Sequence, residues 1–431
     1  MSGLHYRHMK KPFERFDMAR DPVRTKGYLK PITWLLSAPA WWSHKVQIHR
    51  NGTEGLKPPY LLLCNHNAFM DFKVATKVIY PNKANYVVAI DGFIGREWLL
   101  RSVGCICKRK FTNDTILVSQ LKKVIDNGDI AVVYPEARYS LCGTTAVLPS
   151  SLGKLCKLLK VPVATLICHG HHVNSPFWNL HERHIAPTEA DYTLQFTPEQ
   201  LETLTVDEIN ERLVDAFQYD DFAWLREKGL KMKYDRRAEG LQKVLYQCPD
   251  CGTEYEMTAE GNILRCSHCG HRWEMADDGV LHALDGSARF SHVPDWYEWE
   301  RENVREEVEA GTYSSGELPV HIDTLPNSRR YIRLGNGTLL HDGEGFHVRG
   351  TDVDGDPISA DWPVPTLYSC HIEYEYLGKY GDCVDLNTLE DTWYIYPEAK
   401  RFSVTKMALA TEELYYAWRR SIGKPCPPGL A

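Results

Sequence analysis

The chain has 431 residues, of which 43% are hydrophobic and 25% charged, so it is too long for one typical domain and too apolar for a disordered protein. Its net charge of −7 argues against a general nucleic-acid binder. The charge is uneven, because residues 1–50 carry +7 and the remainder therefore carries −14. A basic segment on an acidic body indicates either an anionic partner, such as a phospholipid membrane surface, or a solvated arm without a partner.

The N-terminal segment, residues 1–50, also contains an aromatic stretch. Residues 1–24 have no apolar core of a signal peptide, so we expect a cytoplasmic protein with reduced cysteines. The apolar run "PITWLLSAPAWW" is shorter than the ~20 residues of a membrane-spanning helix. Its tryptophans fit either a segment in the lipid interface or a short core helix; they are Trp34, Trp41 and Trp42. On the first reading the protein associates peripherally with a membrane.

Alternating apolar runs and helical stretches follow, and we place the first folded domain at residues 51–244. The runs "YLLLC", "NYVVAI", "DIAVVYP" and "PVATLIC" are typical of buried strands. Helices are predicted between them at Phe72–Ile79, Glu97–Ser102 and Asp114–Asn127. The charged stretch 206–243 predicts two closing helices. This alternation indicates an α/β domain with a mainly parallel sheet.

Two cysteine pairs define a second unit, residues 245–280. "CPDC" and "CSHC" supply four thiolates in two closely spaced pairs, which is the pattern of a zinc ribbon: Cys248, Cys251, Cys266 and Cys269. Gly252 and Gly270 follow the pairs, where the turn favours positive φ. A closed set of four thiolates predicts structural zinc, with a redox pair as the alternative. A protein partner is an open option for this ribbon; no nucleic acid is expected.

The third unit, residues 285–425, is rich in strands. Runs such as "TLYSCHIEYEY" and "DTWYIYP" are separated by Gly and Asp turns, and Val404–Arg420 predicts a closing amphipathic helix. This layout resembles a pleckstrin-homology-like barrel. "TDVDGD" lacks the spacing of a calcium loop and predicts a hairpin turn at Asp354-Gly355.

The stretch "LLLCNHNAFMDF" places His66 at the end of a buried strand and Asp71 just inside the next helix. Both residues then lie at the carboxyl edge of a parallel sheet, where α/β folds bind substrates. A carboxylate on one imidazole nitrogen leaves the other free to act as a base toward a hydroxyl. The alternative is a packed histidine that is bonded to a nearby aspartate and has no catalytic role.

Four sequence blocks resemble those of the glycerolipid acyltransferase family, of the lysophosphatidate acyltransferase type. In chain order they are "NHNAFMD", "SVGCICKRK", "VVYPEARYS" and "KVPVATLIC". The resemblance implies an O-acyltransferase that moves a fatty acyl group from acyl-CoA or acyl carrier protein to a lysophosphatidate-type acceptor in phospholipid synthesis. It implies His66 as the base, Asp71 as its orienting partner and no catalytic metal.

The third block implies a phosphate-binding role, but it departs from the family pattern. Ala137 replaces the usual Gly, and Tyr139 stands where the family has Arg. A cationic patch for the acceptor's phosphate is expected from Lys108, Arg109, Lys110 and Arg138. Glu136 is expected to orient Arg138 or backbone amides, or to be a plain helix-start carboxylate. The altered block leaves other acceptors open, such as glycerol-3-phosphate or another lysophospholipid, as well as a non-catalytic adaptor.

Overall fold

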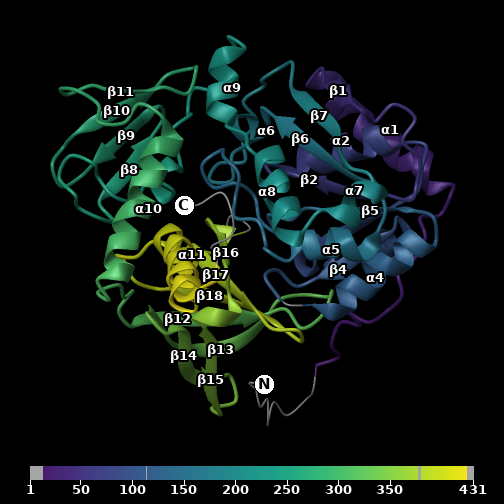
Figure 1. Ribbon diagram of the computed structural model, residues 1–431. Coiled ribbons are helices and arrows are strands. Elements are labelled where there is room, and N and C mark those ends of the chain that lie inside the picture. The colour runs from purple at the N-terminus through teal and green to yellow at the C-terminus, as the bar shows by residue number, and fades with distance from the viewer. Residues whose placement is uncertain (1–12, 113, 377–379, 425–431) are drawn as a thin grey trace.

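The computed structural model describes residues 13–112, 114–376 and 380–424, which form three parts in chain order (Figure 1). The first part is an α/β domain, the second a four-stranded ribbon, and the third a seven-stranded sheet closed by a helix. This is the predicted order. Residues 1–12 of the predicted basic segment lie outside the described residues.

The α/β domain is built on a seven-stranded sheet in the order β1-β7-β6-β2-β5-β3-β4. Its strands are β1 (Gln47–Asn51), β2 (Leu61–Cys64), β3 (Ala84–Ala89), β4 (Cys105–Lys108), β5 (Ile130–Val133), β6 (Val163–His169) and β7 (Glu189–Phe196). Every described pairing is parallel except β6 with β7. The predicted mainly parallel sheet is therefore confirmed, with one antiparallel pair that the sequence pattern did not reveal.

The central strand β2 is apolar throughout because helices cover both faces of the sheet. Leu61 and Leu63 point into one core, whereas Leu62 and Cys64 point into the other. The helices are α1 (Leu29–Ser43), α2 (Phe69–Ile79), α3 (Glu97–Ser102), α4 (Thr115–Asp126), α5 (Leu152–Leu159), α6 (His171–Asn174), α7 (Pro198–Thr203), α8 (Val206–Ala216) and α9 (Asp221–Glu227), with the short 3₁₀ turns η1 (Ile90–Phe93) and η2 (Leu241–Lys243). The second predicted closing helix is short and ends at Glu227, where turns lead toward the ribbon.

The tryptophan-rich stretch was predicted to lie either in the lipid interface or in the core, and helix α1 shows where each tryptophan lies. Trp41 is only 2% exposed, and its indole N–H donates to the Lys73 carbonyl of α2 at 2.7 Å. Trp34 packs edge-on against Trp41, with ring centroids 5.1 Å apart. Trp42 points away from the core and is 68% exposed. The stretch is thus a core helix on one side and an exposed apolar surface on the other.

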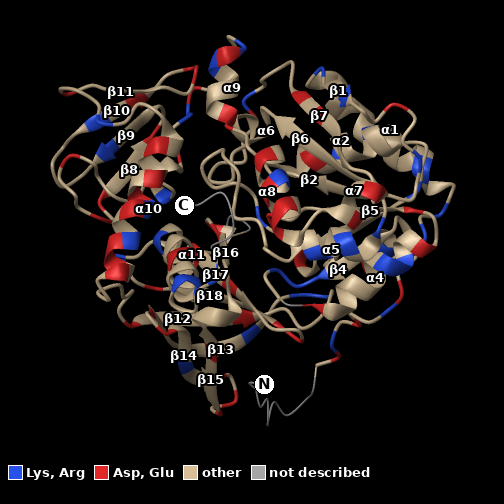
Figure 2. Ribbon diagram, viewed as in Figure 1, with Lys and Arg blue, Asp and Glu red and all other residues tan. Residues whose placement is uncertain are grey.

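The ribbon is an antiparallel sheet in the order β11-β10-β9-β8. Its strands are β8 (Met257–Glu260), β9 (Ile263–Cys266), β10 (Arg272–Met275) and β11 (Leu281–Ala283). The helix that follows, α10 (Val293–Glu309), carries many acidic residues (Figure 2). It packs Trp296 against the ribbon's Trp273, with ring centroids 5.0 Å apart, so the ribbon shares its core with this helix.

The C-terminal sheet is wholly antiparallel among the described strands, in the order β15-β14-β13-β12-β18-β17-β16. The strands are β12 (Leu318–Thr324), β13 (Ile332–Asp342), β14 (Gly345–Asp352), β15 (Pro357–Pro363), β16 (His371–Glu373), β17 (Cys383–Asn387) and β18 (Thr392–Pro397), with the 3₁₀ turn η3 (Val364–Thr366). Asp354-Gly355 lies in the turn between β14 and β15, as predicted. Helix α11 (Val404–Ser421) closes the sheet, also as predicted.

The three parts share hydrophobic cores. One continuous cluster contains Phe111 and Leu141 of the α/β domain, Trp273 of the ribbon, and Leu339 and Leu409 of the C-terminal part. The C-terminal sheet therefore packs firmly against the first domain, and its position decides which groups near the candidate site stay open. Among the described residues, no helix combines the length and apolar character needed to cross a bilayer.

Candidate active site

The loop after β2 brings His66 to the carboxyl edge of the sheet. Asn65 fixes the start of this loop on the neighbouring strand β6, since its side chain accepts from Cys168 N at 2.8 Å and donates to the Cys168 carbonyl at 2.9 Å. The backbone N–H of His66 donates to Glu136 Oε2 at 2.6 Å. The hydrogen bonds of the Asn65 side chain and of the His66 backbone N–H therefore fix the position of the His66 backbone.

Asp71 is fully buried and lies in the first turn of α2. Its Oδ2 accepts hydrogen bonds from the backbone N–H groups of Asn67 and Ala68 at 2.5 and 2.8 Å. His66 Nδ1 lies 3.6 Å from the same oxygen, which is close but too long for a hydrogen bond. The structure thus brings the predicted His–Asp pair together, with a carboxylate that the helix start holds in place.

The imidazole of His66 has one buried and one accessible side. Its Nδ1 is buried without a hydrogen-bond partner and faces Asp71, while the side chain as a whole is 25% exposed. The rings of Tyr134 and Tyr139 pack on it, with centroids 4.6 and 4.3 Å from that of the imidazole. Nε2 is therefore the nitrogen that can meet a substrate, and the two tyrosine rings limit the directions of approach.

Glu136 holds the backbone of the site. Its carboxylate is fully buried and accepts from the backbone N–H of His66 and, at 2.7 Å, of Ala146. Burial raises the pKa of Glu136 to about 8, although these hydrogen bonds oppose the rise. Of the roles expected for Glu136, orienting backbone amides is the one observed, and no contact with Arg138 accompanies it. Glu136 is thus a buried support of the loop backbone, and its predicted place in the substrate-binding block stays a prediction.

The four ribbon cysteines converge at one end of the ribbon. The Sγ atoms of Cys248 and Cys269 are 3.7 Å apart, those of Cys251 and Cys266 are 3.8 Å apart, and all four lie within 4.8 Å of one another. Gly252 and Gly270 have φ values of +71° and +83°, as the predicted turns require. A tetrahedral Zn²⁺ with bonds of ~2.3 Å to sulfur fits four thiolates at this spacing.

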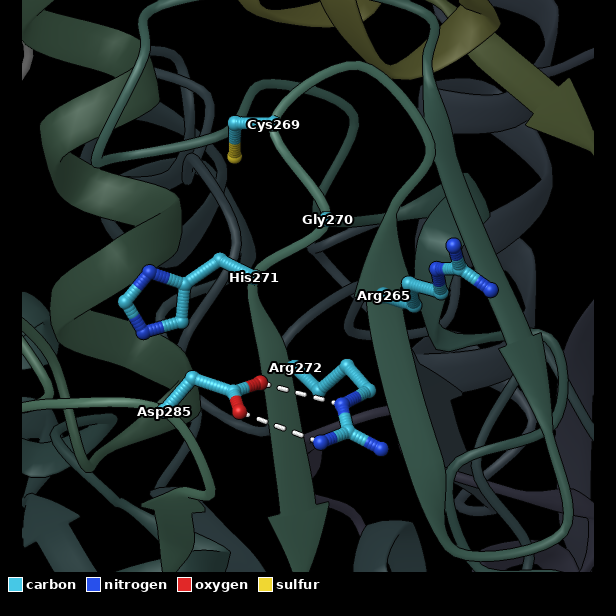
Figure 3. Close-up of a pocket in the computed structure, with 6 residues that line it drawn as sticks. All are labelled: Arg265, Cys269, Gly270, His271, Arg272 and Asp285. Carbon is cyan, nitrogen blue, oxygen red and sulfur yellow. Dashed lines mark hydrogen bonds and ion pairs between the residues drawn. The ribbon is translucent and has the colours of Figure 1, made fainter.

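The neighbouring histidine is not needed as a ligand. His271 stacks on Trp273, with centroids 4.8 Å apart, and its Nδ1 lies 3.2 Å from Asp250 Oδ2. Figure 3 shows a pocket at this part of the ribbon, in which Arg272 forms two hydrogen bonds with Asp285 next to His271. The residues fit a structural zinc site with all four positions taken by cysteine.

Comparison with known proteins finds a family-model match for each of the two motif-bearing regions. Residues 44–169, which contain the His–Asp loop and Glu136, match the family model described as Acyltransferase. This segment is therefore similar to acyltransferase-family domains. Residues 241–273 match a zinc-ribbon model described as "DNA directed RNA polymerase, 7 kDa subunit". That match covers the knuckles and fits the Cys₄ cluster.

The comparisons with solved structures and with curated proteins give weaker similarity or none. A solved structure described as the 1-acyl-sn-glycerophosphate (LPA) acyltransferase PlsC from Thermotoga maritima is 14% identical, with a TM-score of 0.37. The match covers 47% of this chain and 80% of that one. None of the curated proteins compared matches the chain. The pleckstrin-homology-like resemblance of the C-terminal part is not confirmed by these comparisons and stays a prediction.

Within the α/β domain, Arg138 does not face an open site. It is buried, its Nη2 donates to Glu412 Oε1 of α11 at 2.7 Å, and its Nη1 lies 3.4 Å from the Cys370 carbonyl. The preceding Ala137 adopts φ of +56°, a conformation that suits the Gly of the family pattern better. The C-terminal part thus supplies the anion that Arg138 binds in this structure.

Arg109 is buried in the same way. Its guanidinium donates to Thr392 Oγ1 at 2.7 Å and to three backbone carbonyls of the C-terminal part. Lys110 lies 2.8 Å from His371 Nε2, and Lys108 donates to the carbonyl of Thr112. In this structure these side chains contact oxygen and nitrogen atoms of the protein and do not form one open cationic patch, so their phosphate-binding role stays a prediction.

One residue at the site was missed by the sequence analysis. His171, at the start of α6, places its Nδ1 2.5 Å from Asp71 Oδ1 and is fully buried. The available signal was "HGHH", a polar run that begins at the last residue of β6, and β6 is parallel to and paired with β2. Because parallel neighbours end at the same sheet edge, such a run lies beside the end of β2.

Proposed function

We propose that the protein transfers a fatty acyl group from a thioester donor, acyl-CoA or acyl carrier protein, to the hydroxyl of a lysophosphatidate-type acceptor in phospholipid synthesis. The observation that carries the proposal is the partly exposed His66 imidazole, whose buried Nδ1 faces the Asp71 carboxylate in an acyltransferase-family domain. A scaffold without catalysis has no need for a buried carboxylate behind an accessible base.

The chemistry follows from these two groups. His66 Nε2 takes the proton of the acceptor hydroxyl while its oxygen forms a bond to the thioester carbonyl carbon. The carbon–sulfur bond then breaks, and the thiolate leaves with the proton carried by His66. Asp71 stabilises the transient imidazolium from the Nδ1 side, as the aspartate of a catalytic triad does. The substrate supplies the nucleophile, so no serine of the chain takes part.

The acceptor's polar group also needs a binding partner in the site. Arg109 and Arg138 contact the C-terminal part, so a phosphate would require other donors. This observation favours a second candidate, transfer to an acceptor of the same class without a phosphate monoester. Both candidates use the same base and differ only in the group that surrounds the reacting hydroxyl.

A labelled-substrate assay tests the proposal and separates its two forms. Purified protein is incubated with radiolabelled acyl-CoA or acyl carrier protein and with lysophosphatidate, glycerol-3-phosphate, a lysophospholipid diester or monoacylglycerol in vesicles. Ester formation with lysophosphatidate at the highest kcat/KM supports the first form, and preference for the lysophospholipid diester or monoacylglycerol supports the second. Absence of ester with every donor and acceptor would favour the non-catalytic adaptor.

Peripheral docking on a phospholipid surface is the second part of the proposal. Helix α1 carries one charged residue, Lys30, and is drawn almost entirely tan in Figure 2. Its outer side chains Leu35, Leu36 and Trp42 are exposed, as is Phe69 at the start of α2, close to the His–Asp loop. Apolar side chains on a basic segment fit insertion at the interface of an anionic bilayer, where the acceptor lies.

A further inference from the structure

Asp71 lies between two histidines, and the one expected to be catalytic is the more distant. Its Oδ1 is 2.5 Å from His171 Nδ1, whereas its Oδ2 is 3.6 Å from His66 Nδ1. The tighter interaction therefore belongs to a residue outside the His-x4-Asp motif. β2 and β6 are paired and parallel, which brings the loops that carry both histidines to the same edge of the sheet.

The only hydrogen bond of the His171 side chain among the described residues is the one to Asp71. Its Nε2 is buried and has no partner, so the ring acts through Nδ1, whose N–H donates to the Asp71 carboxylate. The side chain thus contributes one directed N–H group, aimed at the catalytic carboxylate.

The backbone on both sides of His171 is also fixed. Asp221 is buried and accepts from the N–H groups of Gly170 and His172 at 3.0 and 2.7 Å. Gly170 has φ of +83°, and a Cβ there would lie 2.4 Å from the Trp224 ring. These contacts leave the His171 ring little freedom to move away from Asp71.

We propose that His171 is a positioning residue for acyl transfer: its Nδ1–H holds Oδ1 of Asp71, so that Oδ2 stays directed at Nδ1 of His66. The inference rests on the proposed function. With Asn67 N, Ala68 N and His171 all donating to it, the carboxylate has little freedom to rotate, and its charge is shared among three donors. Loss of His171 leaves Oδ1 without a partner in a buried site.

The groups around Asp71 determine whether a change in the protonation of His66 can be measured separately from theirs. The titratable groups that face Asp71 are His66, His171, Cys64, Cys168, Tyr134, Tyr139, Tyr219, Glu136 and His172. Burial raises the pKa of the listed thiols and phenols, lowers the pKa of His172 to about 3, and raises that of Glu136 to about 8. The thiols, the phenols, Glu136 and His172 are thus mostly uncharged near pH 6.5, so their own charges do not obscure a change at His66 in this range.

The test compares H171A and H171N with the parent protein. Alanine removes the donor, while the side-chain amide of asparagine can donate from nearly the position of Nδ1. We expect kcat/KM to fall ~10–100-fold in H171A and to recover largely in H171N. The unshared charge of Asp71 should hold the proton on His66 more strongly, so the acid limb of the kcat/KM profile should move to higher pH, by about 0.5–1 unit.

A second readout does not depend on turnover. Carbethoxylation of His66 by diethyl pyrocarbonate, followed by peptide mass spectrometry, reports the pH at which the imidazole loses its proton. We expect this pH to be higher in H171A than in the parent and to be unchanged in H171N. If the parent transfers no acyl group but this shift appears, the proposed function fails and the positioning role stands.

A matched control addresses folding. His172 is the adjacent buried histidine and packs against Trp178 and Phe222, so H172N removes a buried ring that makes no hydrogen bond to Asp71. It should leave the acid limb in place. If H171A does not fold, H171L fills the volume without a donor. The proposal would be overturned if the alanine or leucine variant lost activity equally at all pH values and its His66 carbethoxylation midpoint stayed at the pH of the parent.

Discussion

The His66 loop and the Arg138 loop follow neighbouring strands of one sheet, yet their polar side chains have different fates. His66 and Asp71 are five residues apart, and backbone amides within the same turn hold the carboxylate. Arg138 extends into the interface with α11 and pairs with Glu412, 274 residues later in the chain. A motif confined to one turn fixes its own geometry, whereas a long cationic side chain takes whichever partner a later domain brings.

The zinc ribbon is a second example of a motif whose ligands lie close together in the sequence. Its disruption should have the largest effect on folding. Chelation of zinc, or Cys251→Ser, should unfold the ribbon, because metal binding supplies ~10–16 kcal/mol in structural zinc sites and the four thiolates would otherwise crowd together. One zinc per chain should be found by elemental analysis. Unfolding should be followed by the fluorescence of Trp273, which packs on α10.

Acyl transfer should survive zinc loss in part, since the ribbon lies outside residues 44–169. A metal-free protein whose ribbon gives an unchanged fluorescence and melting profile would exclude the zinc assignment.

His66→Ala should give the next largest effect, on catalysis alone. Loss of a general base typically costs ~10²–10⁴-fold in turnover. The side chain is partly exposed and its Nδ1 makes no hydrogen bond, so the melting temperature should change little. The measurement is kcat for ester formation beside a thermal melt of the same preparation. Turnover close to that of the parent would mean that His66 is only structural.

Arg138→Ala should show the opposite pattern, with loss of stability and little change in acceptor preference. Removing one partner of a buried ion pair costs ~3–5 kcal/mol, and the lower value is expected because Arg301 still binds Glu412 at 2.8 Å. Urea titration gives the change in the free energy of unfolding. A KM that rises selectively for phosphorylated acceptors, with stability unchanged, would return Arg138 to the substrate site and break the comparison.

Replacing exposed residues of α1 should have the smallest effect. The double substitution Leu36→Ser and Trp42→Ser removes apolar contacts with lipid but no core contact, so binding to anionic vesicles should weaken about tenfold in high salt. Cosedimentation measures the bound fraction. Leu389→Ser, at another exposed leucine in the C-terminal part, is the control and should bind like the parent. Equal loss in both proteins would place the docking surface elsewhere.

The sequence allowed the elements and local motifs to be predicted better than their long-range partners. Leu61–Cys64 was recognisable as a buried strand because it is apolar throughout, and Glu97–Ser102 was predicted with its observed bounds. The antiparallel β7 was missed, since strand direction depends on the connection and not on the residues of the strand. Trp41 and Trp42 differ only in the direction in which each leaves α1, which composition cannot distinguish.

The misses at the site have the same cause. Ala137 and Tyr139 signalled that the third block is altered, but nothing near Arg138 in the sequence indicates Glu412. His171 was within reach of sequence reasoning, because the strand before it pairs with β2 and "HGHH" follows without a gap. A search for polar runs after every predicted parallel strand, in place of known blocks alone, would have found it.

The most direct test of the central claim is the fate of a labelled acyl chain. Parent protein and H66A are mixed with the thioester donor and vesicles that contain the glycerol-based acceptor, and the lipid extract is analysed by mass spectrometry. The account predicts the label in an ester at the acceptor hydroxyl with the parent, and label left in the thioester with H66A. Label that stays in the thioester, or is released only as free fatty acid by the parent, would contradict it.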